Sequence, residues 1–411
     1  MGPVLEGPLS AVLDPVQGLY ERFPYPRAET DLDPVASGER APIWSPDGAF
    51  HAYFPDRPKR RDLDVLVAGC GTNLAPALAA HLPEARVVGI DISDASLAIA
   101  RGHQQRHRLD NLELVRLPLE DVAALGREFD LVQCTGVLHH LVDPVAGLRA
   151  LGEVTRVDGA LMIMVYARYG RQGVYQVQEL CRRLGLGPDE AGARATQRLV
   201  QHLPADHAFR RIHPAGGAPI CLEEIADLLL HPRDIAYTVP GVRDLVDGAG
   251  LALHRFLGHA EYTPSLSVLG RLGLAEVADP WEAAAVAELF HGSLIKHRFV
   301  LTNAGRPSAR ELIARAAPSE LFPALNPDVS VRPDGDAAVL VNPTLQVPAE
   351  VRVGRAMLQV LRRADGSRSV ESLAAGWPGG ATALAATLRQ LYLVDVLLFE
   401  VRSAAGAASA G

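Results

Sequence analysis

Apolar and polar positions alternate along the first two thirds of the chain in blocks that predict strands separated by helices. Five short apolar runs alternate with segments whose apolar residues have helical spacing. The runs cover residues 64–68, 87–90, 112–117, 129–135 and 160–166. This alternation predicts an α/β fold, a doubly wound parallel sheet with right-handed crossovers.

Two further runs, 251–258 and 297–302, fit a sixth and a seventh strand. The chain around them is longer than simple crossovers require, and it holds insertions at about 167–236 and 260–296. Ligands of open α/β sheets bind beyond the carboxyl ends of the strands. We therefore expect the insertions, which carry helical patterns, to lie above that edge and to select the substrate.

These patterns divide the 411 residues into three parts. Residues 1–62 are a proline-rich N-terminal lid segment, 63–305 hold the sheet with its insertions, and 306–411 form a small C-terminal α+β domain with a winged-helix-like order of elements. In the first part, aromatic residues beside prolines at 20–27 predict a stiff apolar cover over the ligand. A surface segment that is merely attached to the sheet explains 20–27 nearly as well.

A glycine turn after the first apolar run gives the first chemical signal. Gly69 and Gly71 let the backbone turn sharply and approach a ligand where a Cβ would collide. Asp91 ends the second run, where a carboxylate can accept hydrogen bonds from both hydroxyls of a ribose. A dinucleotide site needs a third glycine where this chain has Leu74. The turn therefore indicates a nucleoside without a pyrophosphate and disfavours an NAD(P)-dependent reductase.

Several stretches resemble class I S-adenosylmethionine-dependent methyltransferases. The turn Ala-Gly-Cys-Gly-Thr-Asn at 68–73 resembles their first motif, and Gly-Val-Leu-His-His-Leu-Val-Asp-Pro at 136–144 resembles the motif after their fourth strand. The stretches 20–27, 166–175 and 230–239 are similar to a bacterial subfamily of these enzymes. The resemblance implies a Rossmann-like seven-stranded sheet with an antiparallel last strand, S-adenosyl-L-methionine as cofactor, and methyl transfer as the activity.

The resemblance also implies which residues hold the cofactor at the ends of the first four strands. They are Gly69, Cys70, Gly71, Asn73, Asp91, Ile92, Leu119, Glu120, Thr135 and Gly136. One position departs from the family, because Pro118 stands where an acidic residue is common, and proline has neither a carboxylate nor a backbone N–H. A small shift of the loop would let Glu120 or Asp121 replace that carboxylate.

Candidates for the transfer step follow the fourth and fifth predicted strands. They are His139, His140, Tyr166, Tyr169 and Arg171. A histidine titrates near ~6.5 and can take a proton from an oxygen or nitrogen nucleophile, although a structural role explains the pair slightly better. The tyrosines can surround or orient an acceptor, and Arg171 can bind a carboxylate. No metal is expected, since a site from His139, His140 and Asp143 lacks a supporting cluster of ligands.

Net charge and cysteine content limit the kinds of partner, metal site and cross-link that the sequence predicts. The formal net charge of −8 gives no global attraction to nucleic acid, which is not expected as a partner, and the basic run at 57–61 fits a solvated linker. The four cysteines form no C-x-x-C pair, so they predict neither a disulfide framework nor a zinc site. No segment has the pattern of a signal peptide or a membrane span, so a cytoplasmic protein is expected.

The sequence thus predicts a methyltransferase acting on a nitrogen or oxygen atom, less readily on carbon. A protein or peptide acceptor is favoured by the appended C-terminal domain, which weakly resembles peptide-binding domains of peptide-modifying enzymes. Dimerisation or stabilisation explains that domain equally well, so a homodimer stays open. A metabolite or natural product is the alternative acceptor, and a non-catalytic cofactor-binding scaffold is the alternative to an enzyme. A cavity shut by 20–27 favours a metabolite, whereas an open groove toward the C-terminal domain favours a peptide.

Overall fold

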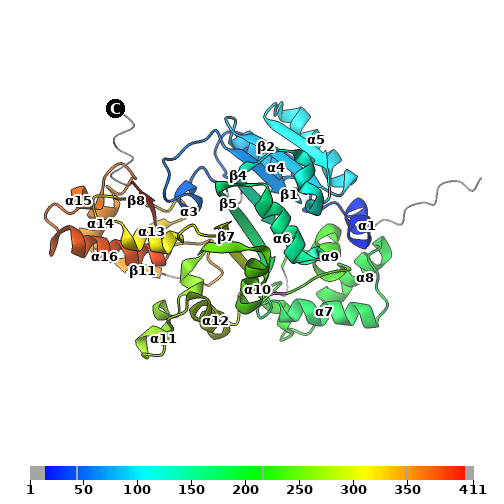
Figure 1. Cartoon of the computed structure of the whole chain (residues 1–411). Helices are drawn as coiled ribbons and strands as arrows, with labels where there is room; N and C mark the ends of the chain where they lie inside the picture. The colour runs from blue at the N-terminus through cyan, green and yellow to red at the C-terminus, as the bar shows by residue number, and fades with distance from the viewer. Residues whose placement is uncertain (1–13, 43–44, 215–216, 348–349, 403–411) are drawn as a thin grey trace, which may run out of the picture.

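The centre of the protein is a seven-stranded sheet with the order β3-β2-β1-β4-β5-β7-β6 (Figure 1). The computed structural model describes residues 14–42, 45–214, 217–347 and 350–402. The strands of the sheet are β1 (Asp64–Ala68), β2 (Arg86–Asp91), β3 (Leu112–Arg116), β4 (Phe129–Thr135), β5 (Thr155–Tyr166), β6 (Leu251–Phe256) and β7 (Lys296–Asn303). The first five strands pair in parallel, and β7 runs antiparallel between β5 and β6. This arrangement confirms the predicted Rossmann-like sheet with an antiparallel last strand.

Alternate residues of the central strands face two separate apolar cores. In β1, Leu66 and Ala68 belong to one core, while Val65 and Val67 belong to the other. The first core is completed by the helices α6 (Pro144–Glu153), α10 (Val239–Ala249) and α12 (Pro280–His291). The second is completed by α3 (Phe50–Tyr53), α4 (Leu74–His81) and α5 (Asp94–His107). Because both faces are covered, these strands are continuous apolar runs in the sequence.

The insertion after β5 forms three helices that pack with the N-terminal part of the chain. These helices are α7 (Gln172–Arg183), α8 (Glu190–Gln201) and α9 (Leu222–Leu229), and they lie beside α1 (Pro15–Arg22) in Figure 1. Leu19 and Phe23, from α1 and the residue after it, share an apolar core with Val177 and Ile225 of the insertion. The short helix α2 (Asp33–Ala36) continues this N-terminal layer through Val35, which is buried with Ala77 of α4.

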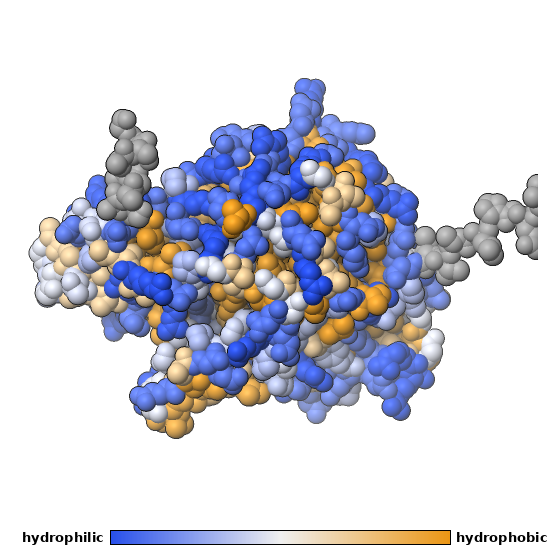
Figure 2. Space-filling view, in the orientation of Figure 1, coloured by the Kyte–Doolittle hydropathy of each residue, from blue (hydrophilic) through white to orange (hydrophobic). Residues whose placement is uncertain are grey.

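The second insertion carries exposed apolar side chains. It contains the short helix α11 (Val268–Arg271) before α12, at the lower left of Figure 1. Large apolar side chains are exposed here, and Figure 2 shows apolar surface on this protrusion; they belong to Val268, Leu272, Leu274, Leu289 and Phe290. Among the residues that the structure describes, no helix is long and apolar enough to cross a membrane.

The C-terminal part is an α+β unit with its own apolar core. Its two small sheets pair β8 (Leu321–Leu325) with β12 (Leu397–Val401), and β9 (Ser330–Asp334) with β10 (Ala337–Val341) and β11 (Glu350–Val353). Its helices are α13 (Ala309–Arg315), α14 (Arg355–Leu361), α15 (Val370–Leu373) and α16 (Gly380–Leu393). A buried ion pair of 3.0 Å between Arg255 of β6 and Asp395 fixes this unit against the large sheet.

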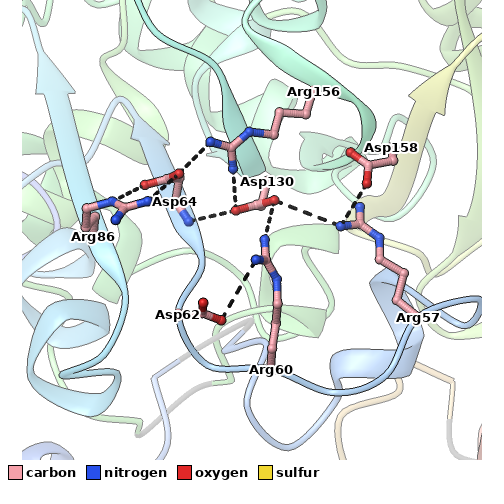
Figure 3. Close-up of a pocket in the computed structure, with 8 residues that line it drawn as sticks. All are labelled: Arg57, Arg60, Asp62, Asp64, Arg86, Asp130, Arg156 and Asp158. Atoms are coloured by element: carbon pink, nitrogen blue, oxygen red, sulfur yellow. Dashed lines mark hydrogen bonds and ion pairs between the residues drawn. The ribbon is translucent and has the colours of Figure 1, made fainter. Parts of the chain in front are cut away.

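The opposite edge of the sheet, at the amino ends of the parallel strands, is held by a network of four arginines and four aspartates (Figure 3). Asp130 is 2 % exposed and pairs with Arg60 at 2.5 Å and Arg156 at 2.6 Å. Arg57 lies 3.3 Å from Asp158. The basic run at 57–61 is therefore no solvated linker, because its arginines compensate a buried carboxylate that would otherwise be costly.

Candidate functional site

A cavity of about 710 Å³ lies at the carboxyl edge of the parallel strands. Its wall combines the glycine turn after β1, the end of β2, the loops after β3 and β4, and residues of segment 14–42. All ten residues that the sequence assigns to the cofactor line this cavity: Gly69, Cys70, Gly71, Asn73, Asp91, Ile92, Leu119, Glu120, Thr135 and Gly136. The fold thus brings four separate stretches of sequence to one site.

The glycine turn is shaped by two close approaches. Gly69 has φ +68°, and a Cβ there would lie 2.3 Å from a methyl carbon of Val137. Gly71 has φ +54°, and a Cβ there would lie 2.6 Å from the carbonyl oxygen of Tyr25. Both positions therefore need glycine, for the left-handed backbone as well as for the space.

Asp91 closes the turn from the neighbouring strand. Its Oδ2 accepts a hydrogen bond of 2.9 Å from the backbone N–H of Gly71, and its Oδ1 accepts one of 2.9 Å from Ser93. Burial raises the pKa of the carboxyl, and these backbone N–H groups oppose the rise. A carboxylate has about four acceptor sites. Asp91 consequently holds the glycine turn in place and keeps acceptor capacity at the cavity.

Side chains beside the glycine turn fix the N-terminal segment over it. The hydroxyl of Thr72 donates to the carbonyl of Pro26 at 2.6 Å, and the amide of Asn73 donates to the carbonyl of Arg27 at 2.9 Å. Asn73 was assigned to the cofactor from the sequence, and it does line the cavity. Its side chain is nevertheless engaged with the segment that covers the site.

Glu21 attaches the same segment to the start of α5. Its carboxylate accepts hydrogen bonds from the backbone N–H groups of Asp94 at 2.7 Å and Ala95 at 3.1 Å. These are two of the N–H groups that a helix leaves without internal partners, and a negative charge there is favoured by the helix dipole. Hydrogen bonds therefore attach the N-terminal segment both to the glycine turn and to the start of α5. The sequence analysis did not single out Glu21.

Pro118 stands where an acidic residue is common in the family that the sequence resembles, and the structure shows which carboxylate lies nearby. Pro118 precedes the 3₁₀ helix η1 (Leu119–Leu125), whose first turn contains Glu120 and Asp121. Pro118, Leu119 and Glu120 line the cavity. A carboxylate therefore remains on this edge two residues after the proline, at Glu120.

Comparison with known proteins agrees with this geometry. Residues 66–161 match the model of a family described as a methyltransferase domain. An uncharacterised protein of Synechococcus sp. is 33% identical over 296 residues, which cover 66% of this chain and 70% of that protein. The chain is 32% identical over 127 residues to the ubiquinone biosynthesis O-methyltransferase of Neisseria meningitidis, and it spans about half (53%) of the length of that enzyme.

A solved structure reproduces most of the fold. PKMT2 from Rickettsia typhi, in complex with AdoHcy, has a TM-score of 0.59 and 13% sequence identity over 88% of this chain and 76% of that one. The chain belongs to the class I S-adenosylmethionine-dependent methyltransferases. The glycine turn and Asp91 of this methyltransferase fit the cofactor, since both line the cavity and the carboxylate can accept further hydrogen bonds.

The residues predicted for the transfer step lie where β4 and β5 end. Of the five residues proposed for the transfer step, His140 and Tyr166 line the cavity. His139 is completely buried behind them, with its ring 3.9 Å from that of Tyr166 between centroids. Tyr169 is half-buried and stands away from the cavity wall, as does Arg171. The structure therefore gathers two of the five at the cavity and places the others around them.

The tautomer of His140 follows from its contacts. Its Nδ1 lies 2.7 Å from the carbonyl oxygen of Arg233, and a carbonyl can only accept, so Nδ1 carries the proton and Nε2 has the free lone pair. Burial lowers the pKa of His140 to about 4. Burial, with His140 and Arg171 nearby, also lowers the pKa of His139 well below its ordinary value. Both imidazoles are consequently neutral at neutral pH.

Arg171 is fixed behind the cavity wall. Its guanidinium carbon lies 3.5 Å from the centroid of the Tyr166 ring, and its Nη2 lies 3.5 Å from Oδ2 of Asp234. Its Nε donates to the hydroxyl of Tyr175 at 3.2 Å. The side chain is therefore held by its own neighbours, and the expected role of binding a substrate carboxylate has no support in its position.

Asp227 of α9 is a functional candidate that the sequence analysis missed. It is 4 % exposed and accepts hydrogen bonds from the hydroxyl of Tyr20 at 2.8 Å and that of Tyr166 at 3.3 Å. Burial raises its pKa to about 6, against the opposing effects of these hydroxyls and of Arg171. Its only signal in the sequence is an acidic residue within the apolar run of 225–230.

Proposed function

We propose that this methyltransferase transfers a methyl group to a hydroxyl oxygen of a small metabolite or natural product. The observation that carries the proposal is the cover of the cavity. Twelve of its 34 lining residues come from segment 14–42, and the described residues of 306–402 contribute none. A cavity of about 710 Å³ lies within the range of roughly 300–1,000 Å³ that is usual for small-molecule sites. The acceptor is thus the alternative that the sequence analysis ranked second.

The lining supports an acceptor that is largely apolar. Near the ends of β4 and β5 the wall includes Val137, Leu141 and Met164, and the phenol rings of Tyr20 and Tyr166 stand beside them. The hydroxyls of both tyrosines donate to one buried carboxylate, that of Asp227, behind the wall. Such a lining binds an apolar body and orients a single polar group of the acceptor.

The chemistry needs an acceptor atom in line with the methyl group and a place for its proton. Bound S-adenosylmethionine would supply a methyl group on its sulfonium, and the thioether S-adenosylhomocysteine would leave as the acceptor oxygen bonds to the methyl carbon. The hydroxyl of Tyr166 donates to Asp227, so its oxygen is left to accept from the acceptor hydroxyl. As the new C–O bond forms, the acceptor proton passes to Tyr166, and the phenol proton passes to Asp227.

Tyr166 acts in this scheme as a relay and Asp227 as the proton acceptor. Burial raises the pKa of Tyr166 well above its ordinary value, so the phenol is neutral and donates. Asp227, with a pKa of about 6, is ionised at neutral pH. A carboxyl whose pKa lies near the working pH is suited to general-base catalysis.

The decisive experiment measures where the methyl group goes. The full-length protein is incubated with methyl-labelled S-adenosylmethionine and, separately, with a panel of small phenols and hydroxy acids or with a set of unmodified proteins and peptides. We expect label in the small-molecule products. Label in protein or peptide alone would overturn the proposal and restore the peptide acceptor.

Asp227→Asn is the matched variant for this experiment. We expect it to bind S-adenosylhomocysteine like the unaltered protein, because Asp227 is not among the residues that line the cavity. Turnover should fall by about 10²–10⁴-fold, the usual contribution of a general base. Full turnover by Asp227→Asn would remove Asp227 from the mechanism.

A further inference from the structure

Three side chains with metal-binding atoms meet beneath the acceptor end of the cavity. Ligand atoms of His139, His140 and Asp234 all lie within 4.8 Å of one another. His139 and His140 belong to the 3₁₀ helix η2 (Leu138–His140) after β4, and Asp234 comes from the loop that joins α9 to α10. The side chain of Asp234 is 3 % exposed, and the histidines are 0 % and 4 % exposed.

These buried atoms have no partner among the residues that the structure describes. Both ring nitrogens of His139, Nε2 of His140 and Oδ1 of Asp234 lack a hydrogen bond. Leaving a buried polar atom unpaired is unfavourable, and four such atoms in one place call for a ligand. A cation bound by their lone pairs would satisfy one nitrogen of each histidine and the carboxylate oxygen together.

The groups around the cluster orient it as metal ligands are usually oriented. His140 has its proton on Nδ1, bound to the carbonyl of Arg233 at 2.7 Å, which leaves Nε2 as the ligand atom. Asp234 accepts a hydrogen bond of 2.9 Å from Gln178 on Oδ2, which leaves Oδ1. Metal-bound imidazoles commonly donate their other N–H to a carbonyl, and bound carboxylates are themselves hydrogen-bonded.

His231 supports this arrangement without belonging to it. Its ring stacks on His140 with 3.7 Å between centroids. Its Nδ1 accepts from the backbone N–H of Arg233 at 3.1 Å, so the proton is on Nε2 and no lone pair is left for a metal. The stacking holds the ring of His140 at a fixed orientation.

The ligand types, together with the charge around them, indicate the class of metal. The guanidinium of Arg171 lies 3.5 Å from Oδ2 of Asp234 and offsets its negative charge. The remaining ligands are two neutral imidazoles. Hard cations such as Mg²⁺ and Ca²⁺ need several oxygen ligands, whereas imidazole suits first-row transition metals. The cluster therefore selects against Mg²⁺ and Ca²⁺.

We propose that His139, His140 and Asp234 bind one transition-metal dication of the Zn²⁺ or Fe²⁺ type. Three protein ligands leave one coordination position of a tetrahedral site open. His140 is the one residue of the three that lines the cavity. A catalytic use of the metal, in holding the acceptor oxygen, rests on the proposed function; binding of the metal does not.

The site departs from the sequence analysis, which expected no metal and considered Asp143 as the third residue. Asp143 instead caps α6, with Oδ1 accepting from the backbone N–H of Ala146 at 2.9 Å. The third ligand comes from Asp234, about ninety residues further on, and only the packing of the insertion on the sheet brings it there.

Titration with Co²⁺ tests the site without measuring activity. The full-length protein is treated with a chelator and then titrated with Co²⁺, and the visible absorption of the bound ion is followed. We expect one equivalent to bind, and a higher melting temperature with Co²⁺ or Zn²⁺. Absence of both effects in the unaltered protein would overturn the proposal and leave the histidines as a neutral buried stack.

Matched variants locate the ion. Asp234→Asn keeps the shape of the side chain and His139→Gln keeps polarity, and both should lose the absorption and the rise in melting temperature. His107→Gln is the control, because the ligand atoms of His107, Asp31 and Asp33 also lie within 4.8 Å of one another, and Asp33 in this second group is exposed. Binding that survives the first two substitutions, or is lost with His107→Gln, overturns the assignment. S-adenosylhomocysteine binding, measured in each variant, shows that the fold is intact and separates this result from failure of the proposed function.

Discussion

The phenol of Tyr20 donates a hydrogen bond of 2.8 Å to the carboxylate of Asp227, which lies 207 residues further along the chain. Tyr20 belongs to α1 and Asp227 to α9, so the bond joins the N-terminal segment to the insertion above the sheet. The second oxygen of Asp227 accepts from Tyr166 at the end of β5. One buried carboxylate therefore connects the cover of the cavity with the proposed acceptor site.

Tyr20→Phe should reduce turnover more than cofactor affinity. The substitution removes a hydrogen bond to a charged group, worth about 1.5–3 kcal/mol, and leaves Asp227 with Tyr166 alone. We expect kcat to fall by about 10–100-fold, while the dissociation constant of S-adenosylhomocysteine changes little. Tyr392→Phe is the control, because its buried hydroxyl has no hydrogen-bond partner among the described residues and is far from the cavity lining.

The activity should decline as the pH falls through about 6, where Asp227 becomes protonated. A protonated carboxyl cannot take the acceptor proton, so kcat measured between pH 5 and 8 should follow the ionised fraction. Burial is the largest cause of this raised pKa; Asp234 also raises it, whereas Tyr20, Arg171 and Tyr166 lower it. A profile of kcat that is flat from pH 5 to 8 would argue against Asp227 as the proton acceptor.

Protonation of Asp227, which should lower the activity, should raise the stability of the fold. The folded pKa of about 6 lies above that of an unfolded aspartate, so folding becomes less favourable as the pH rises between about 4 and 6. The ionised carboxylate costs up to about 3 kcal/mol above pH 6. Thermal unfolding at pH 8 should therefore show Asp227→Asn to be at least as stable as the unaltered protein, with the difference shrinking toward pH 4.

Asp91→Asn should weaken cofactor binding. The amide offers one acceptor oxygen in place of two and no charge, so hydrogen bonds to the ribose and to Gly71 are lost. We expect the dissociation constant of S-adenosylhomocysteine, measured by calorimetric titration, to rise by at least about tenfold. Asp94→Asn is the control: this exposed residue lies three positions further on and pairs with Arg116 away from the cavity lining. Equal effects of the two substitutions would contradict the ribose assignment.

Gly71→Ala should displace the N-terminal segment. The new Cβ would meet the carbonyl oxygen of Tyr25 at 2.6 Å, and the φ of +54° is unfavourable for alanine. We expect weaker S-adenosylhomocysteine binding and faster proteolysis near Tyr25. Gly102→Ala in α5 is the matched control, since a Cβ there has no atom within 4 Å. Alanine in a helix interior is more favourable than glycine by about 0.5–1 kcal/mol, so this control should gain stability.

Asp395→Ala should destabilise the contact between the C-terminal unit and the sheet. Asp395 pairs with Arg255 at 3.0 Å, with side chains 4 % and 2 % exposed. Removing one member of a buried ion pair costs about 3–5 kcal/mol, because the other charge is left uncompensated. Denaturant unfolding measures this loss. Glu350→Ala, which removes an exposed partner of Arg332, should change stability by less than about 1 kcal/mol.

Much of the sheet and of the cofactor cradle could be predicted from the sequence. The strands are apolar runs because helices bury both of their faces, and the glycine turn and Asp91 lie within one strand–helix–strand unit. Such features are local, so spacing along the chain determines them. The six assigned residues within this unit line the cavity for this reason, whereas the four at or after the ends of β3 and β4 reach it through the order of the strands in the sheet.

The acceptor end could not be predicted in the same way. Tyr20, Asp227 and Tyr166 come from three separate elements, and Asp234 meets His139 across about ninety residues. No periodicity encodes contacts between elements, because they depend on how the insertion packs on the sheet. Arg171 is an example in the other direction. Its position in the sequence suggested a contact with the substrate, but packing places its guanidinium against the ring of Tyr166.

The sequence by itself determined the order of strands and helices and the nucleoside cradle, because both rest on short-range patterns and backbone geometry. The resemblance of its motifs to a known family implied the class of reaction. The tertiary structure alone decided what covers the cavity, which carboxylate meets the tyrosines, and which acid completes the histidine pair. Those relationships depend on burial, which removes water from charged and polar groups and makes their few remaining partners decisive.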